Sequence, residues 1–119
     1  METSIPVQND AVKLAKHTIK ITLNARKFPK KYRHNLIDEL IKTTIRLSNA
    51  ICDANTHSGA ERLKHIDTAI AECRNVKIGI DIVYDTIHPD CSIGYWNGMA
   101  EDIEKQLRNW KIGTRKRMK

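Results

Sequence analysis

The chain has 119 residues, which is enough for one domain with a modest hydrophobic core. Its 21 lysines and arginines against 14 acidic residues give a formal net charge of +7, and the pI is near 9.5. This balance favours an acidic partner, such as nucleic acid, an acidic protein or an anionic membrane surface, over a protein that merely happens to be basic.

The cysteines and the apolar runs exclude several classes of protein. Cys52, Cys73 and Cys91 lie far apart and include no CxxC, so neither a disulfide framework nor a zinc site is expected. Unpaired thiols fit a reducing, cytoplasmic compartment. The opening METSIPVQND has no apolar stretch, and no later run is long enough to span a membrane. We therefore expect no signal peptide and no membrane segment.

The first predicted helix covers about residues 8–27, with Asn9 or Asp10 as its N-cap. Apolar and polar residues alternate over Ile19–Leu23, which also fits a strand. The available partner for such a strand would be Ile78–Ile82, and this segment lies within a longer helical pattern. We therefore predict a helix.

The second predicted helix, about residues 29–54, has the widest apolar face in the chain. Phe28 precedes Pro29, which disfavours helical angles at Phe28 and suits the proline to a first helical turn. Two adjacent rows follow at steps of three or four: Leu36, Leu40, Thr44, Leu47 and Ile51, beside Ile37, Ile41, Ile45, Ser48 and Cys52. One partner helix cannot cover both rows, so we expect a central helix with part of the second row at a subunit interface.

Two further helices are predicted over about residues 59–87 and 92–112. Ser58 and Glu61 have the spacing of a capping box, Gly79 permits close helix packing, and Ser92 is a plausible N-cap. Gly113 is a natural C-terminal stop, which leaves a mobile basic tail over residues 114–119. The predicted fold class is all-α, a single-domain antiparallel up-down four-helix bundle.

The cations gather in three groups that could contact phosphates. No acidic residue occurs between Asp10 and Asp38, which favours a functional role for the first group over a merely solvated helix corner. The candidate nucleic-acid-binding residues are Arg26, Lys27, Lys30, Lys31 and Arg33, then Arg74 and Lys77, then Arg108, Lys111, Arg115, Lys116 and Arg117. For the second group, pairing of Lys77 with Asp81 is an equal alternative. For the third, a solubilising terminus is an equal alternative, and the first and third groups are expected at opposite ends.

The sequence contains no recognisable catalytic or metal-binding motif. The five histidines show no HxxxH, HxxE or ExxH spacing, and the chain has no glycine-rich phosphate loop, nucleophile elbow or paired-carboxylate site. We therefore expect a protein that is not an enzyme and uses no cofactor or metal.

Three short motifs resemble a family of small bacterial four-helix-bundle proteins. Phe28-Pro29-Lys30-x-x-Arg33 resembles the FP-x-x-x-R start of its second helix, and CRNVKI over residues 73–78 is similar to its basic third helix. Residues 102–110, DIEKQLRNW, are similar to its C-terminal pattern of acidic-Ile-Gly-Arg-x-Leu-Gly-Gly-Trp, although Glu104, Arg108 and Asn109 replace residues that are often glycine. The family includes proteins encoded in intervening sequences of large-subunit rRNA genes, and the accessory variability determinant (Avd) proteins of diversity-generating retroelements.

The resemblance implies a homopentamer of bundles with a basic surface. For the Avd branch it implies a partner reverse transcriptase and binding of RNA or DNA. The leading hypothesis is therefore a nucleic-acid-binding accessory subunit. The alternatives are a structural RNA-binding protein of the rRNA-intervening-sequence type and a protein-only scaffold.

Overall fold

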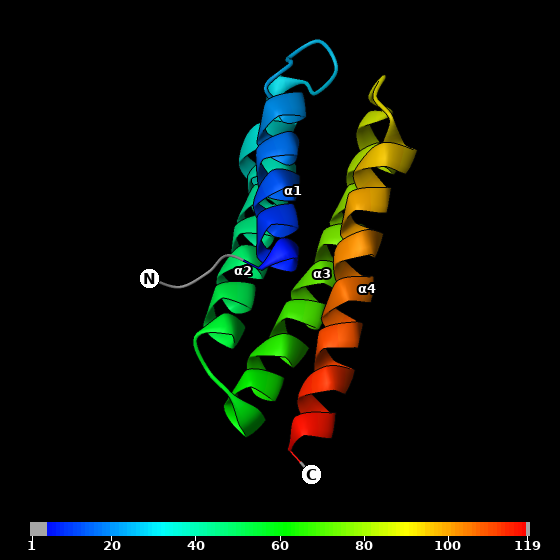
Figure 1. Cartoon of the computed structure of the whole chain (residues 1–119). Coiled ribbons are helices and arrows are strands. Elements are labelled where there is room, and N and C mark those ends of the chain that lie inside the picture. The colour runs from blue at the N-terminus through cyan, green and yellow to red at the C-terminus, as the bar shows by residue number, and fades with distance from the viewer. Residues whose placement is uncertain (1–4, 119) are drawn as a thin grey trace.

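The computed structural model describes residues 5–118 and contains four α-helices, with two short helical turns before the second (Figure 1). The elements are α1 (Pro6–Thr22), the 3₁₀ turn η1 (Lys30–Tyr32), the π-helical turn η2 (Arg33–Ile37), α2 (Asp38–Asn55), α3 (Gly59–Ile87) and α4 (Ile93–Arg117). No strand occurs within these described residues, so the all-helical prediction is confirmed. The strand alternative is wrong, because Ile78–Ile82 lies within α3 and residues 19–22 belong to α1.

Each helix packs against two others in a rod that measures 52 × 26 × 20 Å: α1 and α3 both lie against α2 and α4. The α1–α2 connection and the α3–α4 turn lie at one end of the rod, which we call the upper end (Figure 1). The α2–α3 loop and the end of α4 lie at the opposite, lower end. The short helix α1 runs alongside only the upper part, so α2, α3 and α4 alone continue to the lower end. None of the helices described is long and apolar enough to cross a membrane.

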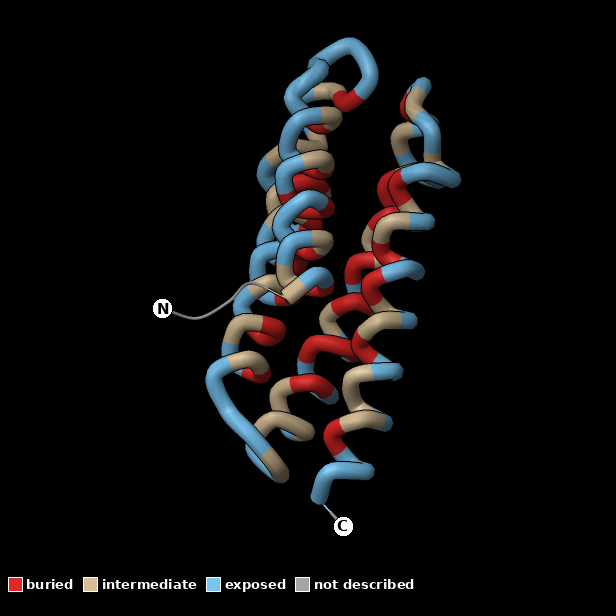
Figure 2. Tube along the Cα trace, in the orientation of Figure 1, coloured by how far each residue is buried: buried red, intermediate tan, exposed pale blue. Residues whose placement is uncertain are grey.

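The core is a continuous apolar strip facing inward from all four helices (Figure 2). Its largest fully buried side chain is Trp96 of α4. The indole Nε1–H of Trp96 donates to Thr18 Oγ1 at 3.0 Å, and the Thr18 hydroxyl in turn donates to the Leu14 carbonyl at 2.8 Å. The Phe28 ring meets Trp96 edge-on, with a 6.3 Å centroid separation. Phe28 is therefore a core residue and takes no part in a binding surface.

The bounds of α1 and the start of the second helix differ from the predictions, whereas α3 and α4 start where they were predicted to start. Helix α1 begins at Pro6, with Ile5 rather than Asn9 or Asp10 as N-cap, and ends at Thr22 rather than near residue 27. Beyond Thr22 the chain turns back so that Phe28 can enter the core. The regular part of the second helix then begins at Asp38, because the stretch from Lys30 to Ile37 is wound as 3₁₀ and π turns.

Helix α4 continues past Gly113 to Arg117, so the predicted stop and mobile tail are wrong for residues 114–117. Thr114 is buried, and this packing keeps the last turn helical. At the other end of α4, the predicted cap is confirmed, since Ser92 Oγ accepts the Tyr95 N–H at 3.2 Å. The capping box before α3 is wrong, because the Ser58 side chain makes no capping hydrogen bond and Gly59 starts the helix with φ +58°.

Gly79 permits the close approach of α2 and α3, as predicted. A Cβ atom placed on Gly79 would lie 2.8 Å from Leu40 Cδ1, closer than van der Waals contact allows. Leu40 is 3% exposed and packs into the core over this glycine. The missing side chain therefore leaves room for Leu40 of α2 to pack directly on the α3 backbone.

Candidate nucleic-acid interface

Four cations lie exposed on the α1–α2 connection at the upper end, and we call Arg26, Lys27, Lys30 and Lys31 the corner cluster. Their backbone is held by a compact turn, in which Asn24 Oδ1 accepts the N–H groups of Arg26 at 3.0 Å and Lys27 at 3.4 Å. None of the four forms an ion pair with a described residue. The chain thus presents their full positive charge to solvent from a fixed turn.

Arg33 has a structural role that the sequence did not reveal. Its Nη2 donates to the Thr22 carbonyl at 2.8 Å, which satisfies a free acceptor at the C-terminal end of α1. A cation there also interacts favourably with the helix dipole. Arg33 is half-buried, so its guanidinium ties the connection to α1 and is less available to a ligand than the corner cluster. Beside it, the Lys31 ammonium lies 5.0 Å from the centre of the half-buried Tyr32 ring.

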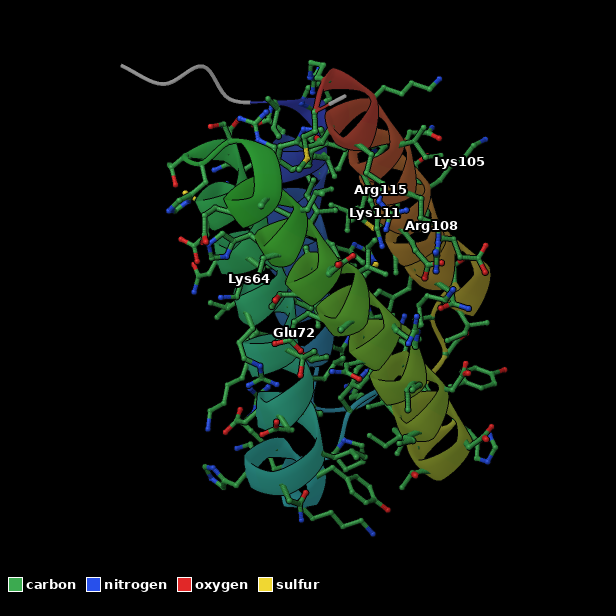
Figure 3. All side chains as sticks on the ribbon, turned by 90° about the horizontal axis from the view of Figure 1, so that it is seen from below. Lys64, Glu72, Lys105, Arg108, Lys111 and Arg115 are labelled. Atoms are coloured by element: carbon green, nitrogen blue, oxygen red, sulfur yellow. The ribbon has the colours of Figure 1, made fainter. Side chains whose placement is uncertain are left out.

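The α3–α4 face carries cations that are already paired. Glu104 accepts from Lys77 at 3.4 Å and from Arg108 at 3.1 Å, while Lys111 pairs with Asp67 at 2.7 Å. The alternative that Lys77 pairs with Asp81 is wrong, because its partner is on α4. Figure 3 shows Arg108 and Lys111 along α4 together with Lys105 and Arg115. The predicted residue Arg74 is exposed on α3 and forms no ion pair with a described residue.

Two ionic partners hold Glu104 in its charged form. Burial acts to raise its pKa, but the hydrogen bonds and charges of Arg108 and Lys77 outweigh burial and hold the pKa below its usual value. Glu104 therefore stays ionised at neutral pH and neutralises part of the charge that the sequence assigned to this face. A polyanion that bound here would have to compete with this carboxylate.

Arg115, Lys116 and Arg117 are exposed in the last turn of α4, at the lower end. Cations in a last helical turn stabilise the helix through its dipole, which gives them a structural function independent of any ligand. Figure 1 places them at the end of the rod opposite the corner cluster, so the two groups do not form one surface. Lys119, which belongs to the same basic stretch, lies outside the described residues.

A cavity of about 290 Å³ adjoins the corner cluster, and we call it the upper cavity. It is lined by His17, Lys20, Ile21, Asn24, Lys27 and Cys91. Burial and the nearby Lys20 lower the pKa of His17, so its imidazole is mostly neutral at pH 7. Sequence reasoning missed Lys20, although the absence of acidic residues between Asp10 and Asp38 extends over it.

The corner cluster thus offers four exposed cations without ion pairs to described residues, whereas on the α3–α4 face Lys77, Arg108 and Lys111 are paired with carboxylates. Exposed lysines and arginines on a fixed turn are suited to phosphate groups. No protein-family model, curated protein or solved structure matches the chain.

Proposed function

We propose that the protein is a non-catalytic accessory protein that binds the phosphate backbone of RNA or DNA through the corner cluster. The observation that carries this proposal is the set of four exposed cations, Arg26, Lys27, Lys30 and Lys31, which have no ion-pair partner among the described residues. Neutralising phosphates with such groups releases counterions, so binding is driven electrostatically and shows little sequence preference.

The finer features of the proposal come from the motifs and from the apolar surface. The FP-x-x-x-R motif at Phe28–Arg33 and the DIEKQLRNW segment support an antiparallel up-down bundle of the Avd type. In this proposal the chain acts in the cytoplasm as a homo-oligomer, with five subunits, and presents nucleic acid to a partner reverse transcriptase. Part of the second apolar row on α2 remains exposed at Ile45, as an oligomer would require.

Salt dependence of binding tests the proposal. Fluorescence anisotropy with a labelled single-stranded RNA and a labelled DNA duplex gives log K against log salt. Each lost phosphate contact reduces the slope by about 0.7 on a single strand and about 0.9 on a duplex. For the variant Lys30→Ala/Lys31→Ala, the magnitude of this slope should therefore fall by about 1.4 on the single strand and about 1.8 on the duplex.

A charge-matched control separates the corner cluster from the general positive charge. Lys64→Ala/Lys105→Ala removes two exposed lysines that form no ion pair in the described part of the chain, and the first of these lies on α3 and the second on α4 (Figure 3). This control should change the slope by less than half as much. Equal slopes for the two double variants would refute the corner cluster as the interface.

A protein scaffold is the second candidate, and a groove between α2 and α3 favours it. The groove is lined by Gly79 and by the exposed residues Ile78 and Ile82, which are 51% and 47% accessible. An apolar surface of this kind is typical of protein contacts. If Ile82→Lys abolished an oligomer seen by light scattering while the wild type bound no RNA or DNA, the scaffold function would replace the first proposal.

A further inference from the structure

The upper cavity combines a concave shape with positive charge, and it lies where the corner cluster begins. Its volume of about 290 Å³ is at the lower end of the range for small-molecule sites, so it suits a compact ligand. Lys27 belongs both to the corner cluster and to the cavity lining, so the two are continuous. A nucleic-acid backbone on the corner cluster would therefore pass the mouth of this cavity.

The polar groups of the upper cavity favour an anion. Lys20 and Lys27 carry the two positive charges of its lining, and neither is engaged in an ion pair within residues 5–118. Asn24 uses its Oδ1 to accept backbone N–H groups, while its amide NH₂ makes no hydrogen bond to any other described residue. Two ammonium groups and one free amide donor match the oxygens of a phosphate.

The remaining wall of the upper cavity favours a flat, weakly polar group. Ile21 is half-buried in the lining, and His17 carries a mostly neutral ring. The ring of Tyr95, which is 61% exposed, meets His17 edge-on at a centroid separation of 5.2 Å. An exposed aromatic ring beside a cavity gives a base a surface on which to stack.

We propose that the upper cavity binds one unpaired nucleotide of a bound strand, with its phosphate held by Lys20 and Lys27 and its base against Ile21 and the His17–Tyr95 pair. This inference deepens the proposed function and rests on it. A base within a duplex cannot enter the cavity, so the pocket adds affinity for single strands only. Asp90, which adjoins Cys91 and acts on its thiol electrostatically, opposes the phosphate from outside the lining.

Labelling of Cys91 can report directly on ligand binding, because this residue lines the upper cavity. The rate of iodoacetamide labelling of each cysteine is followed by peptide mass spectrometry, with uridine monophosphate, adenosine monophosphate or inorganic phosphate added. Either mononucleotide should slow labelling of Cys91 and leave half-buried Cys52, on α2, unchanged. Cys73 should stay unlabelled, since burial raises the pKa of its thiol to about 12.

Matched variants assign the contacts. Lys20→Gln should weaken mononucleotide binding by about tenfold, as expected for a lost hydrogen bond to a charged group. Lys16→Gln removes the same charge one turn earlier on α1, outside the cavity lining, and should have little effect. Tyr95→Ala should weaken binding of adenosine monophosphate by about tenfold and leave that of inorganic phosphate unchanged. Asp90→Asn should tighten binding by about threefold.

The outcomes separate this inference from the function on which it rests. Protection of Cys91 by mononucleotides, lost in Lys20→Gln and kept in Lys16→Gln, supports the nucleotide pocket. Protection by inorganic phosphate as strong as by mononucleotides overturns it, since the base would then contribute nothing. Salt-dependent binding of strand and duplex alike, with Cys91 unprotected, overturns the pocket and leaves the corner cluster standing. Absence of any oligonucleotide binding refutes the proposed function itself.

Discussion

The buried hydrogen bond between Trp96 and Thr18 allows us to predict how much a core substitution lowers the free energy of unfolding. Replacing Thr18 by valine keeps the shape of the side chain but removes the acceptor for the indole N–H, which lies 3.0 Å from the hydroxyl oxygen. Both side chains are 0% exposed, so no water can replace the lost partner without rearrangement. An orphaned buried donor costs about 1–3 kcal/mol, and we expect Thr18→Val to lower the free energy of unfolding by about 2 kcal/mol.

A double-mutant cycle isolates this hydrogen bond from changes in packing. In the Trp96→Phe background no indole N–H remains, so adding Thr18→Val should cost less than about 0.5 kcal/mol. For a chain of 119 residues the entropy of unfolding is about 0.25 kcal/mol/K, so a loss of 2 kcal/mol lowers Tm by about 8 °C.

Denaturant titration followed by circular dichroism at 222 nm measures each variant at one protein concentration, because any oligomer makes stability concentration-dependent. If Thr18→Val costs the same in both backgrounds, the hydrogen bond does not contribute in the way that the geometry requires.

Three further predictions concern charge, the α1–α2 connection and glycine. The folded chain lowers the pKa of Glu104, so this carboxylate stabilises the fold above its usual pKa of 4.5, and the stabilisation is lost as pH falls through the folded pKa. Glu104→Gln should therefore lower the free energy of unfolding by about 1 kcal/mol at pH 7 and make that free energy depend less on pH in the acid range. Arg33→Ala should lower Tm through loss of the hydrogen bond to the end of α1, whereas Lys30→Ala should leave Tm unchanged, as thermal melts would show. Gly98→Ala, where a Cβ meets no atom within 4 Å, should gain about 1 kcal/mol in denaturant titrations, and Gly79→Ala should gain less because Leu40 must move.

Helical periodicity predicted the number of helices, the all-helical class and the approximate bounds of α3. The cap at Ser92 and the close packing at Gly79 followed from local chemistry that needs no tertiary information. The ends of α1 and α4 could not be predicted in this way. Burial of Phe28 shapes the connection after α1, and burial of Thr114 extends α4 beyond a glycine that would otherwise stop it. In both places a contact made in the folded chain overrides a local preference.

The candidate site shows the same division between local and tertiary information. An acid-free stretch of sequence led to the prediction that Lys30 and Lys31 contact phosphates, and this stays a prediction. In the structure both lysines are exposed and neither forms an ion pair with a described residue. Pairing across helices is invisible to that argument, so the attachment of Lys77 on α3 to Glu104 on α4 was missed. The pair of Glu104 and Arg108 lies within α4 at a spacing of four residues, so helical periodicity could have indicated it. The role of Arg33 was missed for a related reason: a guanidinium that reaches a carbonyl eleven residues earlier leaves no periodic signal.

The shortness of α1 has a consequence for how the protein opens. Trp110 lines a pocket together with Ile5, Pro6 and Val7 at the start of α1, and the guanidinium of Arg62 lies 5.5 Å from the centre of its ring. Trp96, in contrast, is fully buried and hydrogen-bonds to Thr18 of α1. Backbone amides of the three-helix lower segment should therefore exchange with deuterium by local opening, while those around Trp96 should exchange only when the whole chain unfolds. The two tryptophans thus report on separate events: Trp110 emission should shift red early in a denaturant titration, and Trp96 emission at the global transition.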